Sequence, residues 1–188
     1  MFRKKKGSLL LIFISLLIPI VSAYVYQQQS QSMIQYILNT RSYYDPSSDI
    51  AAYGWMVNGS STHYGAIDDG IRNTSTPILT DYIYTHAKRT DEIGFPAVSE
   101  SGIASIIIWV YSETGSNAIT IIDLKNDGNI QATLTVNPSS PQGWRSTVWS
   151  NPSSIGSITA DFTHDKQGGG TSTDSTVYAA YIEVIITP

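Results

Sequence analysis

Short apolar runs separated by polar turns set the pattern of the chain from Asp45 onward. The separators are clusters of Gly, Pro, Asn, Asp and Ser, and the runs are rich in Ile, Val, Thr and aromatic residues, which favour strands. This pattern predicts an all-β domain. The clearest expected strands are residues 103–111, 118–124, 130–136, 155–162 and 177–187. Between the second and the third, Asp127-Gly128 suits the positive φ angles of a tight turn, which predicts a β-hairpin.

In two of these expected strands, the pattern of apolar and polar residues predicts which faces are buried. Residues 106–110 read Ile-Ile-Ile-Trp-Val and are apolar on both faces, so we expect a central strand with Trp109 in the core. In the last strand Ile182 and Val184 alternate with Glu183, which predicts one buried face and one face in water. Many short strands without helical periodicity favour two packed sheets. We therefore predict a two-sheet β-sandwich of jelly-roll type over residues 41–188.

The first 40 residues have a different pattern. Residues 1–7 are basic, residues 8–19 are apolar, and Val-Ser-Ala at 21–23 suits a signal peptidase, so residues 1–23 are expected to form a signal helix that is cleaved between Ala23 and Tyr24. A retained membrane anchor and cleavage after Gly7, as in type IV pilin leaders, are the alternatives. Residues 24–40 form a Gln-rich arm whose pattern fits a helix or a strand. The protein is predicted to be secreted or held at the cell surface, with membrane contact only through an uncleaved signal segment.

Composition and charge narrow the possible functions. The chain has 15 acidic and 11 basic residues, and four of the basic ones lie in the signal segment. The remaining seven basic residues leave the mature chain at a net charge of −8 without a basic cluster, which argues against binding to nucleic acid. The absence of cysteine excludes disulfides, thiol catalysis and cysteine metal sites.

A series of motifs resembles the jelly-roll domains of secreted archaeal proteins and phage structural proteins, including carbohydrate-binding modules. The matching residues are Tyr44-Asp45-Pro46, Gly54-Trp55, Ile67-Asp68-Asp69, Asp81-Tyr82-Ile83 and the closing Tyr181-Ile182-Glu183-Val184. The resemblance implies a non-catalytic surface or binding domain, with Trp55 in the core. The signal segment followed by the Gln-rich arm also resembles archaeal cell-surface proteins that build threads by passing a strand to the next subunit.

Candidate metal and catalytic residues are few. His63, His86 and His164 are far apart and lack metal-ligand spacing, and there is no Gly-x-Ser-x-Gly motif for a nucleophile. Asp68, Asp69 and Asp81 could begin to form a structural calcium site, although an Asp-x-Asp-x-Asp-Gly loop is missing. No other cofactor is expected. We predict no catalytic residues and no enzymatic activity.

Candidate ligand and modification sites lie in polar stretches. Trp144 and Trp149 are expected to flank a loop and to stack on sugar rings, with Arg145 donating hydrogen bonds to hydroxyl groups, whereas burial of Trp149 at the sandwich edge is the simpler alternative. Asn58 and Asn73 begin Asn-x-Ser sequons and are candidate glycosylation sites.

These features lead to three functional hypotheses. The first is a secreted, non-catalytic structural or adhesive protein of the cell surface, which could form filaments if the arm at residues 24–40 adds a strand to the next subunit. The alternative is a carbohydrate-binding module, and the second alternative is a small glycan-active enzyme whose carboxylates cannot be identified. The expected partners are other copies of the chain or surface glycans.

Overall fold

The computed structural model describes residues 40–52, 54–166 and 174–187. Arg41–Thr187 forms one compact unit, distinct from Met1–Thr40 with Pro188. The described residues contain one short 3₁₀ helix, η1 (Tyr64–Ala66), and are otherwise strands and loops, which confirms the all-β prediction. The strands are β1 (Thr40–Tyr44), β2 (Ser48–Ala52), β3 (Met56–Asn58), β4 (Tyr82–Thr85), β5 (Arg89–Gly94), β6 (Ile103–Thr114), β7 (Ala118–Asn126), β8 (Asn129–Val136), β9 (Gly143–Ser150), β10 (Ile158–Lys166) and β11 (Ser175–Ile186).

The signal segment and most of the arm are outside this description. Residues 1–39, including the predicted cleavage site between Ala23 and Tyr24, are not described, so those predictions stay open. Among the residues that are described, no helix is long and apolar enough to cross a membrane.

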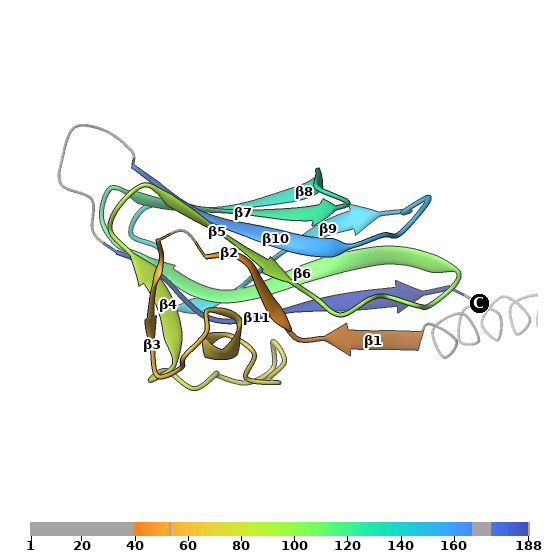
Figure 1. The fold of residues 1–188 in the computed structure, drawn as a ribbon, viewed down its shortest axis with the longest axis horizontal. Coiled ribbons are helices and arrows are strands. Elements are labelled where there is room, and N and C mark those ends of the chain that lie inside the picture. Colours follow the sequence, from red (N-terminus) through yellow and green to blue (C-terminus); the bar gives the residue numbers. More distant parts are fainter. Residues whose placement is uncertain (1–39, 53, 167–173, 188) are drawn as a thin grey trace, which may run out of the picture. The chain divides into compact units, whose positions relative to one another are not determined.

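Strands β4 to β11 are wound as a jelly roll (Figure 1). Their antiparallel pairs are nested around the central turn: β7 with β8, β6 with β9, β5 with β10 and β4 with β11. Further pairing of β6 with β11 and of β7 with β10 joins them into two sheets. Sheet A has the order β3-β4-β11-β6-β9, with β1 also paired to β11, and sheet B has the order β2-β5-β10-β7-β8. The nested pairs confirm the predicted jelly-roll β-sandwich.

The predicted hairpin lies at the centre of this nesting. Asn126 pairs with Asn129, and the two residues between them have positive φ angles, 48° at Asp127 and 78° at Gly128. Both angles are those of a type I′ turn, whose twist matches that of the flanking strands. All five expected strands are present, with ends that differ by a few residues.

The core lies between the two sheets. Period-two alternation along β6 and β7 sends every second side chain inward, so Ile106, Ile108 and Ile122 are fully buried. Trp55 closes the core from the segment before β3 and is 3% exposed, which confirms its expected burial. Each such side chain contributes about 1.5–3 kcal/mol through loss of contact with water.

Two predictions about the outer face of sheet A were wrong. Strand β6 is central, between β11 and β9, but Ile108 and Val110 take the inward positions, so Trp109 points outward and is half-buried. Glu183 also points outward, yet it is only 3% exposed instead of facing water. It accepts hydrogen bonds from Trp109 Nε1 at 2.9 Å and from Arg41 Nη1 at 2.7 Å, and these partners shield it.

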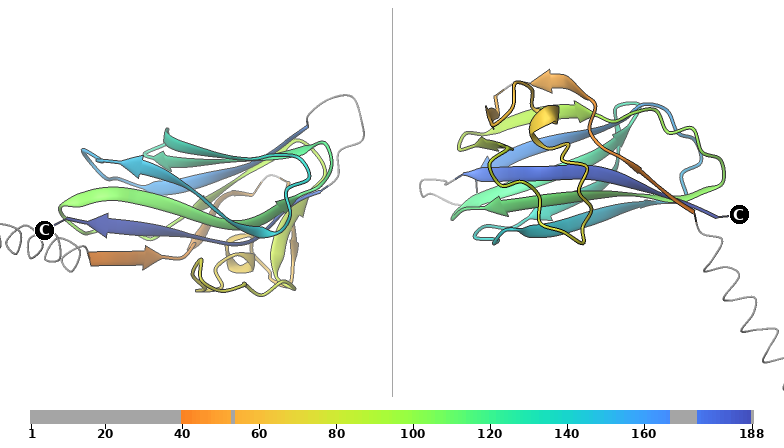
Figure 2. Two further views of the ribbon diagram at one scale, coloured as in Figure 1. Left: turned by 180° about the vertical axis from the view of Figure 1, so that it is seen from behind. Right: turned by 90° about the horizontal axis from the view of Figure 1, so that it is seen from below.

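A long connection covers part of that same face. Residues 59–81, here called the strap, run between β3 and β4 and pass across the outer side of β11 (Figure 2). Ile67 is fully buried, and its carbonyl accepts a hydrogen bond of 2.9 Å from the backbone N–H of Ala180 in β11. The strap is therefore packed against sheet A.

Candidate functional site

The outer face of sheet A carries a row of aromatic side chains. In β4 the core residue Ile83 lies between Tyr82 and Tyr84, so both tyrosines point outward. In β6 the outward residue Tyr111 follows the buried Val110. A register shift in β11 between Val177 and Ala179 leaves the intervening Tyr178 on the outward side, where its ring meets those of Tyr82 and Tyr111.

Successive rings in this row are in contact. The centroid distances are 5.6 Å for Tyr84 to Tyr82, 5.4 Å for Tyr82 to Tyr178, 6.1 Å for Tyr178 to Tyr111, 5.3 Å for Tyr111 to Trp144 and 5.6 Å for Trp144 to Tyr181. Tyr43 and Trp109 extend the row from Tyr181 at 6.0 Å and 6.4 Å. Most pairs are tilted or edge-to-face, the arrangements that ring quadrupoles favour.

The strap divides the row into a covered part and an accessible part. Its Arg72 stacks over Tyr43 and Tyr181 at 5.1 and 4.8 Å and forms a two-pronged ion pair with Asp45. Tyr181 is 1% exposed as a result. Trp144 Nε1 donates a hydrogen bond of 2.7 Å to the carbonyl of Ser75, which fixes the strap at the far side of the face.

The accessible part is the aromatic patch, which we define as Tyr82, Tyr84, Tyr111, Tyr178 and Trp144. All but Tyr178 are partly exposed, and Tyr178 is 6% exposed beneath its neighbours. Its hydroxyl donates to Glu113 Oε1 at 2.5 Å and accepts from Gln142 Nε2 at 2.9 Å. Burial, and then the hydrogen bond to Glu113, raise the pKa of Tyr178 to about 12, so it remains a neutral donor.

A pocket continues the aromatic patch toward the end of the sheet. It has a volume of about 300 Å³ and is lined by Glu113, Thr114, Gly115, Asp174 and Thr176. Thr176 pairs with Glu113 on one side and with Tyr84 on the other, so the pocket and the patch share strands β6 and β11. Apolar rings beside a polar pocket are the usual composition of a small-molecule or saccharide site.

The structure separates the three residues predicted to stack on glycans. Residues 143–149 belong to strand β9, so the expectation of a loop there was wrong. Trp144 pairs with Tyr111 and faces outward, whereas Trp149 pairs with Ile106 and packs against the core. Arg145 donates to the carbonyls of Ser112, Gly143 and Pro141 at the edge of the sheet. Only Trp144 therefore belongs to the aromatic patch.

The three aspartates proposed for calcium lie on the strap, Asp68 and Asp69 in its middle and Asp81 at its end, and they influence one another electrostatically. Burial raises the pKa of Asp68, Asp69 and Asp81, and the charge of Asp81 raises the pKa of the other two further. Asp69 Oδ2 accepts a hydrogen bond from the N–H of Ile78, while Asp81 Oδ1 is buried without a hydrogen-bond partner. Across the described ranges, no group of three or more acidic or histidine side chains is arranged to hold a metal ion.

The two sequon asparagines also lie on or beside the strap. Asn58, the last residue of β3, donates from Nδ2 to the carbonyl of Thr80 at 2.6 Å. Asn73 is exposed in a turn closed by a 3.0 Å hydrogen bond from the N–H of Ser75 to the carbonyl of Arg72.

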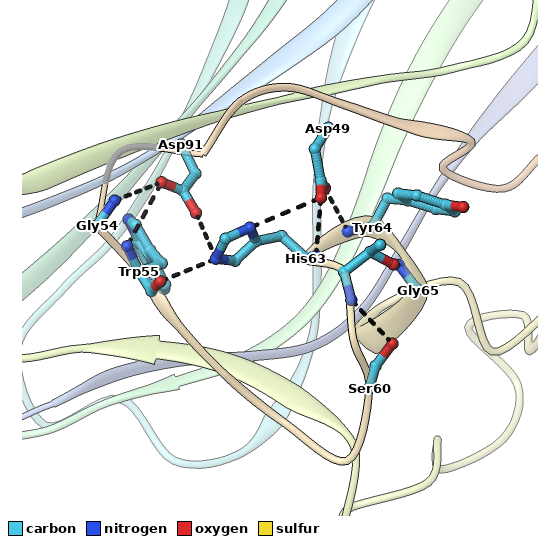
Figure 3. A network of polar contacts seen from close by, with 9 residues as sticks. Asp49, Gly54, Trp55, Ser60, His63, Tyr64, Gly65 and Asp91 are labelled. Carbon is cyan, nitrogen blue, oxygen red and sulfur yellow. Dashed lines mark hydrogen bonds and ion pairs between the residues drawn. The ribbon is translucent and has the colours of Figure 1, made fainter.

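A buried polar network ties the start of the strap to sheet B (Figure 3). His63 Nε2 lies 2.8 Å from the carbonyl oxygen of Trp55 and 3.4 Å from Oδ2 of the fully buried Asp91 in β5. Asp49 in β2 accepts from the N–H groups of His63 and Tyr64 at 3.2 and 2.8 Å. These contacts satisfy backbone groups and position the strap, so His63 has a structural role here.

The sequence patterns described above did not predict the aromatic row. Tyr82 and Tyr84 on either side of Ile83 were a usable signal, because period-two alternation places both on one face. Tyr178 and Tyr181 gave no such signal, because they are three residues apart and lie on the same face only through the register shift in β11.

The chain is similar to solved structures at low sequence identity. No protein-family model matches the sequence, and no curated protein matches it. Among solved structures, the CBM36-1 domain of a multidomain xylanase from the hindgut metagenome of Trinervitermes trinervoides is 12% identical, with 77% of this chain and 96% of that one covered and a TM-score of 0.40. The module CBM6cm-2 of Cellvibrio mixtus lichenase 5A, in complex with cellotriose, is 11% identical, with 78% and 97% covered and a TM-score of 0.40. These identities and TM-scores carry no assignment of fold or function, and the jelly-roll assignment rests on the strand pairing described above.

Proposed function

We propose that this protein is a non-catalytic domain that binds a glycan chain along the aromatic patch. One observation carries the proposal: the rings of Tyr84, Tyr82, Tyr111 and Trp144 are partly exposed and lie in one row on the outer face of sheet A. Large aromatic side chains are normally buried, because each removes about 150–250 Å² from water. Several partly exposed aromatic rings in one row indicate a surface that is covered when a ligand binds.

The chemistry of the patch suits sugars better than an apolar ligand. The faces of pyranose rings carry C–H groups, which pack on aromatic rings, and their edges carry hydroxyl groups, which need hydrogen-bond partners. Gln142 and Glu113 stand beside Tyr178 and can supply such partners. The row follows the sheet across β4, β11, β6 and β9, which suits a chain of linked sugars rather than a single one.

The test is binding of the protein to a panel of soluble polysaccharides, measured by affinity electrophoresis and then by calorimetry. Tyr82→Ala is expected to weaken binding at least tenfold, because it removes a central ring of the patch. Tyr43→Ala is the matched control: this tyrosine is 42% exposed on the same face, but it lies on the Arg72 side of Tyr181, outside the patch. Absence of binding to every polysaccharide, or equal binding by both variants and the parent protein, would contradict the proposal.

Structural calcium is a separate proposal for Asp68, Asp69 and Asp81. The buried oxygen Asp81 Oδ1, which lacks a hydrogen-bond partner, supports it, and backbone carbonyls would have to supply the remaining ligands. Millimolar calcium is expected to raise the melting temperature of the EDTA-treated protein, and Asp81→Asn is expected to abolish that rise. An unchanged melting temperature would rule the site out.

Within the structural and adhesive hypothesis, filament formation depends on the arm, of which only Thr40 is described, as the first residue of β1. Filament formation by strand addition therefore stays a prediction. A chain starting at Thr40 keeps β1 and removes the rest of the arm, so it can be compared with the full chain by size-exclusion chromatography. If the full chain stays monomeric at high concentration, the filament hypothesis fails.

A further inference from the structure

The pocket beside the aromatic patch is acidic. Glu113 and Asp174 both line it, and the other lining residues are two threonines and a glycine. Glu113 Oε1 is held by the hydroxyl of Tyr178, which in turn accepts from Gln142, so the carboxylate is kept in a fixed position as an acceptor. Asp174 is more exposed, with His86 Nδ1 at 3.8 Å from its Oδ1.

Three arginines on or beside this face are already engaged in other contacts. Arg41 is paired with Glu183, and Arg72 is paired with Asp45 while it stacks on Tyr181. The guanidinium group of Arg145 donates hydrogen bonds to three backbone carbonyls, and burial lowers the pKa of Arg145. An anionic sugar in the pocket would therefore meet the charges of Glu113 and Asp174, while these three arginines are engaged elsewhere.

We infer that the pocket selects an amino sugar, binding its protonated amine between Glu113 and Asp174 while a neighbouring sugar ring packs on the aromatic patch. This rests on the proposed glycan-binding function and adds the class of sugar. An ammonium group donates three hydrogen bonds, so it can serve both carboxylates at once. Uronic acid polymers are disfavoured by the same charges, and neutral glucans lack the ionic contact with the two carboxylates.

Three oligosaccharides of equal length isolate the contribution of the amine. β-1,4-Linked oligomers of glucosamine, N-acetylglucosamine and glucose differ only at carbon 2, which carries an ammonium, an acetamide or a hydroxyl group. We expect the protein to bind the glucosamine oligomer about tenfold more tightly than the glucose oligomer, at a pH where the amine is protonated. Because the added contact is ionic, this preference should shrink as salt is raised.

Charge-neutralising variants then locate the preference. Glu113→Gln keeps an acceptor for Tyr178 and should remove most of the preference for the glucosamine oligomer over the glucose oligomer. Asp174→Asn should act in the same direction and tests the second carboxylate without touching the hydrogen bond of Tyr178. Asp123→Asn is the matched control, since this carboxylate accepts from Thr133 in sheet B, away from the patch.

The outcomes separate the two proposals. Equal binding of the three oligomers, with a loss on Tyr82→Ala, overturns the amino-sugar inference and leaves glycan binding in place. A preference that survives both Glu113→Gln and Asp174→Asn also overturns the inference. Failure of all three oligomers to bind, in a protein that binds another polysaccharide, overturns the amino-sugar inference and leaves glycan binding in place, and failure of every polysaccharide to bind overturns both proposals.

Discussion

Removal of the Asp91 carboxylate is expected to be the most damaging single change outside the apolar core. Asp91 is fully buried, and its Oδ1 accepts from the N–H groups of Gly54 at 3.2 Å and Trp55 at 3.4 Å. Its Oδ2 lies 3.4 Å from His63 Nε2. One carboxylate therefore serves two backbone amides and the histidine that holds the strap.

The expected loss follows from those contacts. In Asp91→Ala the N–H of Trp55 is left buried without its acceptor, which costs about 1–3 kcal/mol. The N–H of Gly54 can turn to water because Gly54 is exposed, so only the net value of its bond to a charged acceptor is lost, about 1 kcal/mol. Together with weaker anchoring of His63, we expect the free energy of unfolding to fall by about 2–4 kcal/mol.

Urea unfolding followed by tryptophan fluorescence measures this loss. Asp91→Asn is the matched control, because it keeps an oxygen acceptor for the two amides and removes only the charge, so we expect it to cost less than half as much. The m-value should be similar in the three proteins if the folded states are equally compact. A loss below about 0.5 kcal/mol in Asp91→Ala would show that the network does not stabilise the fold, and the reasoning would fail.

Three further changes test other parts of the fold. Trp109→Ala should cost about 1–3 kcal/mol in urea unfolding, less than a core aromatic, because the half-buried ring mainly gives Glu183 a hydrogen-bond donor, whereas a cost near that of a core tryptophan would contradict its outward position. Burial lowers the pKa of His164 below its ordinary 6.5, so the unfolded chain binds a proton that the folded chain does not. Stability should therefore fall as the pH drops below about 6.5, and His164→Gln should flatten this slope in urea unfolding at several pH values. Gly128→Ala should cost about 1–2 kcal/mol through its φ of 78° alone, since no atom lies within 4 Å of the added Cβ, and an unchanged midpoint would contradict the type I′ turn.

For the candidate site, the sequence could indicate only which side chains of a single strand share a face. The alternation Tyr82-Ile83-Tyr84 is local information, and it places two rings on the face opposite the core. The contact of these rings with Tyr178 and Tyr111 depends on strands that meet only in the folded sheet and on a register shift that apolar periodicity does not reveal. The pocket at Glu113 and Asp174 has the same origin, because its lining comes from two strands 61 residues apart in the chain.

What the amino-acid sequence by itself determined is the class of the fold and its central hairpin. Period-two alternation, turn residues and the Asp127-Gly128 pair act within a few residues, so they indicate strands and a tight turn without knowledge of the rest of the chain. The tertiary structure decided which face of a uniformly apolar strand meets the core, and which outward side chains are shielded from water. Trp109 was predicted in the core, but Ile108 and Val110 occupy the inward positions of its strand. Glu183 was predicted to face water, but Arg41 and Trp109, which are 142 and 74 residues away in sequence, cover its carboxylate. Burial is a property of such long-range neighbours, and a local pattern does not contain them.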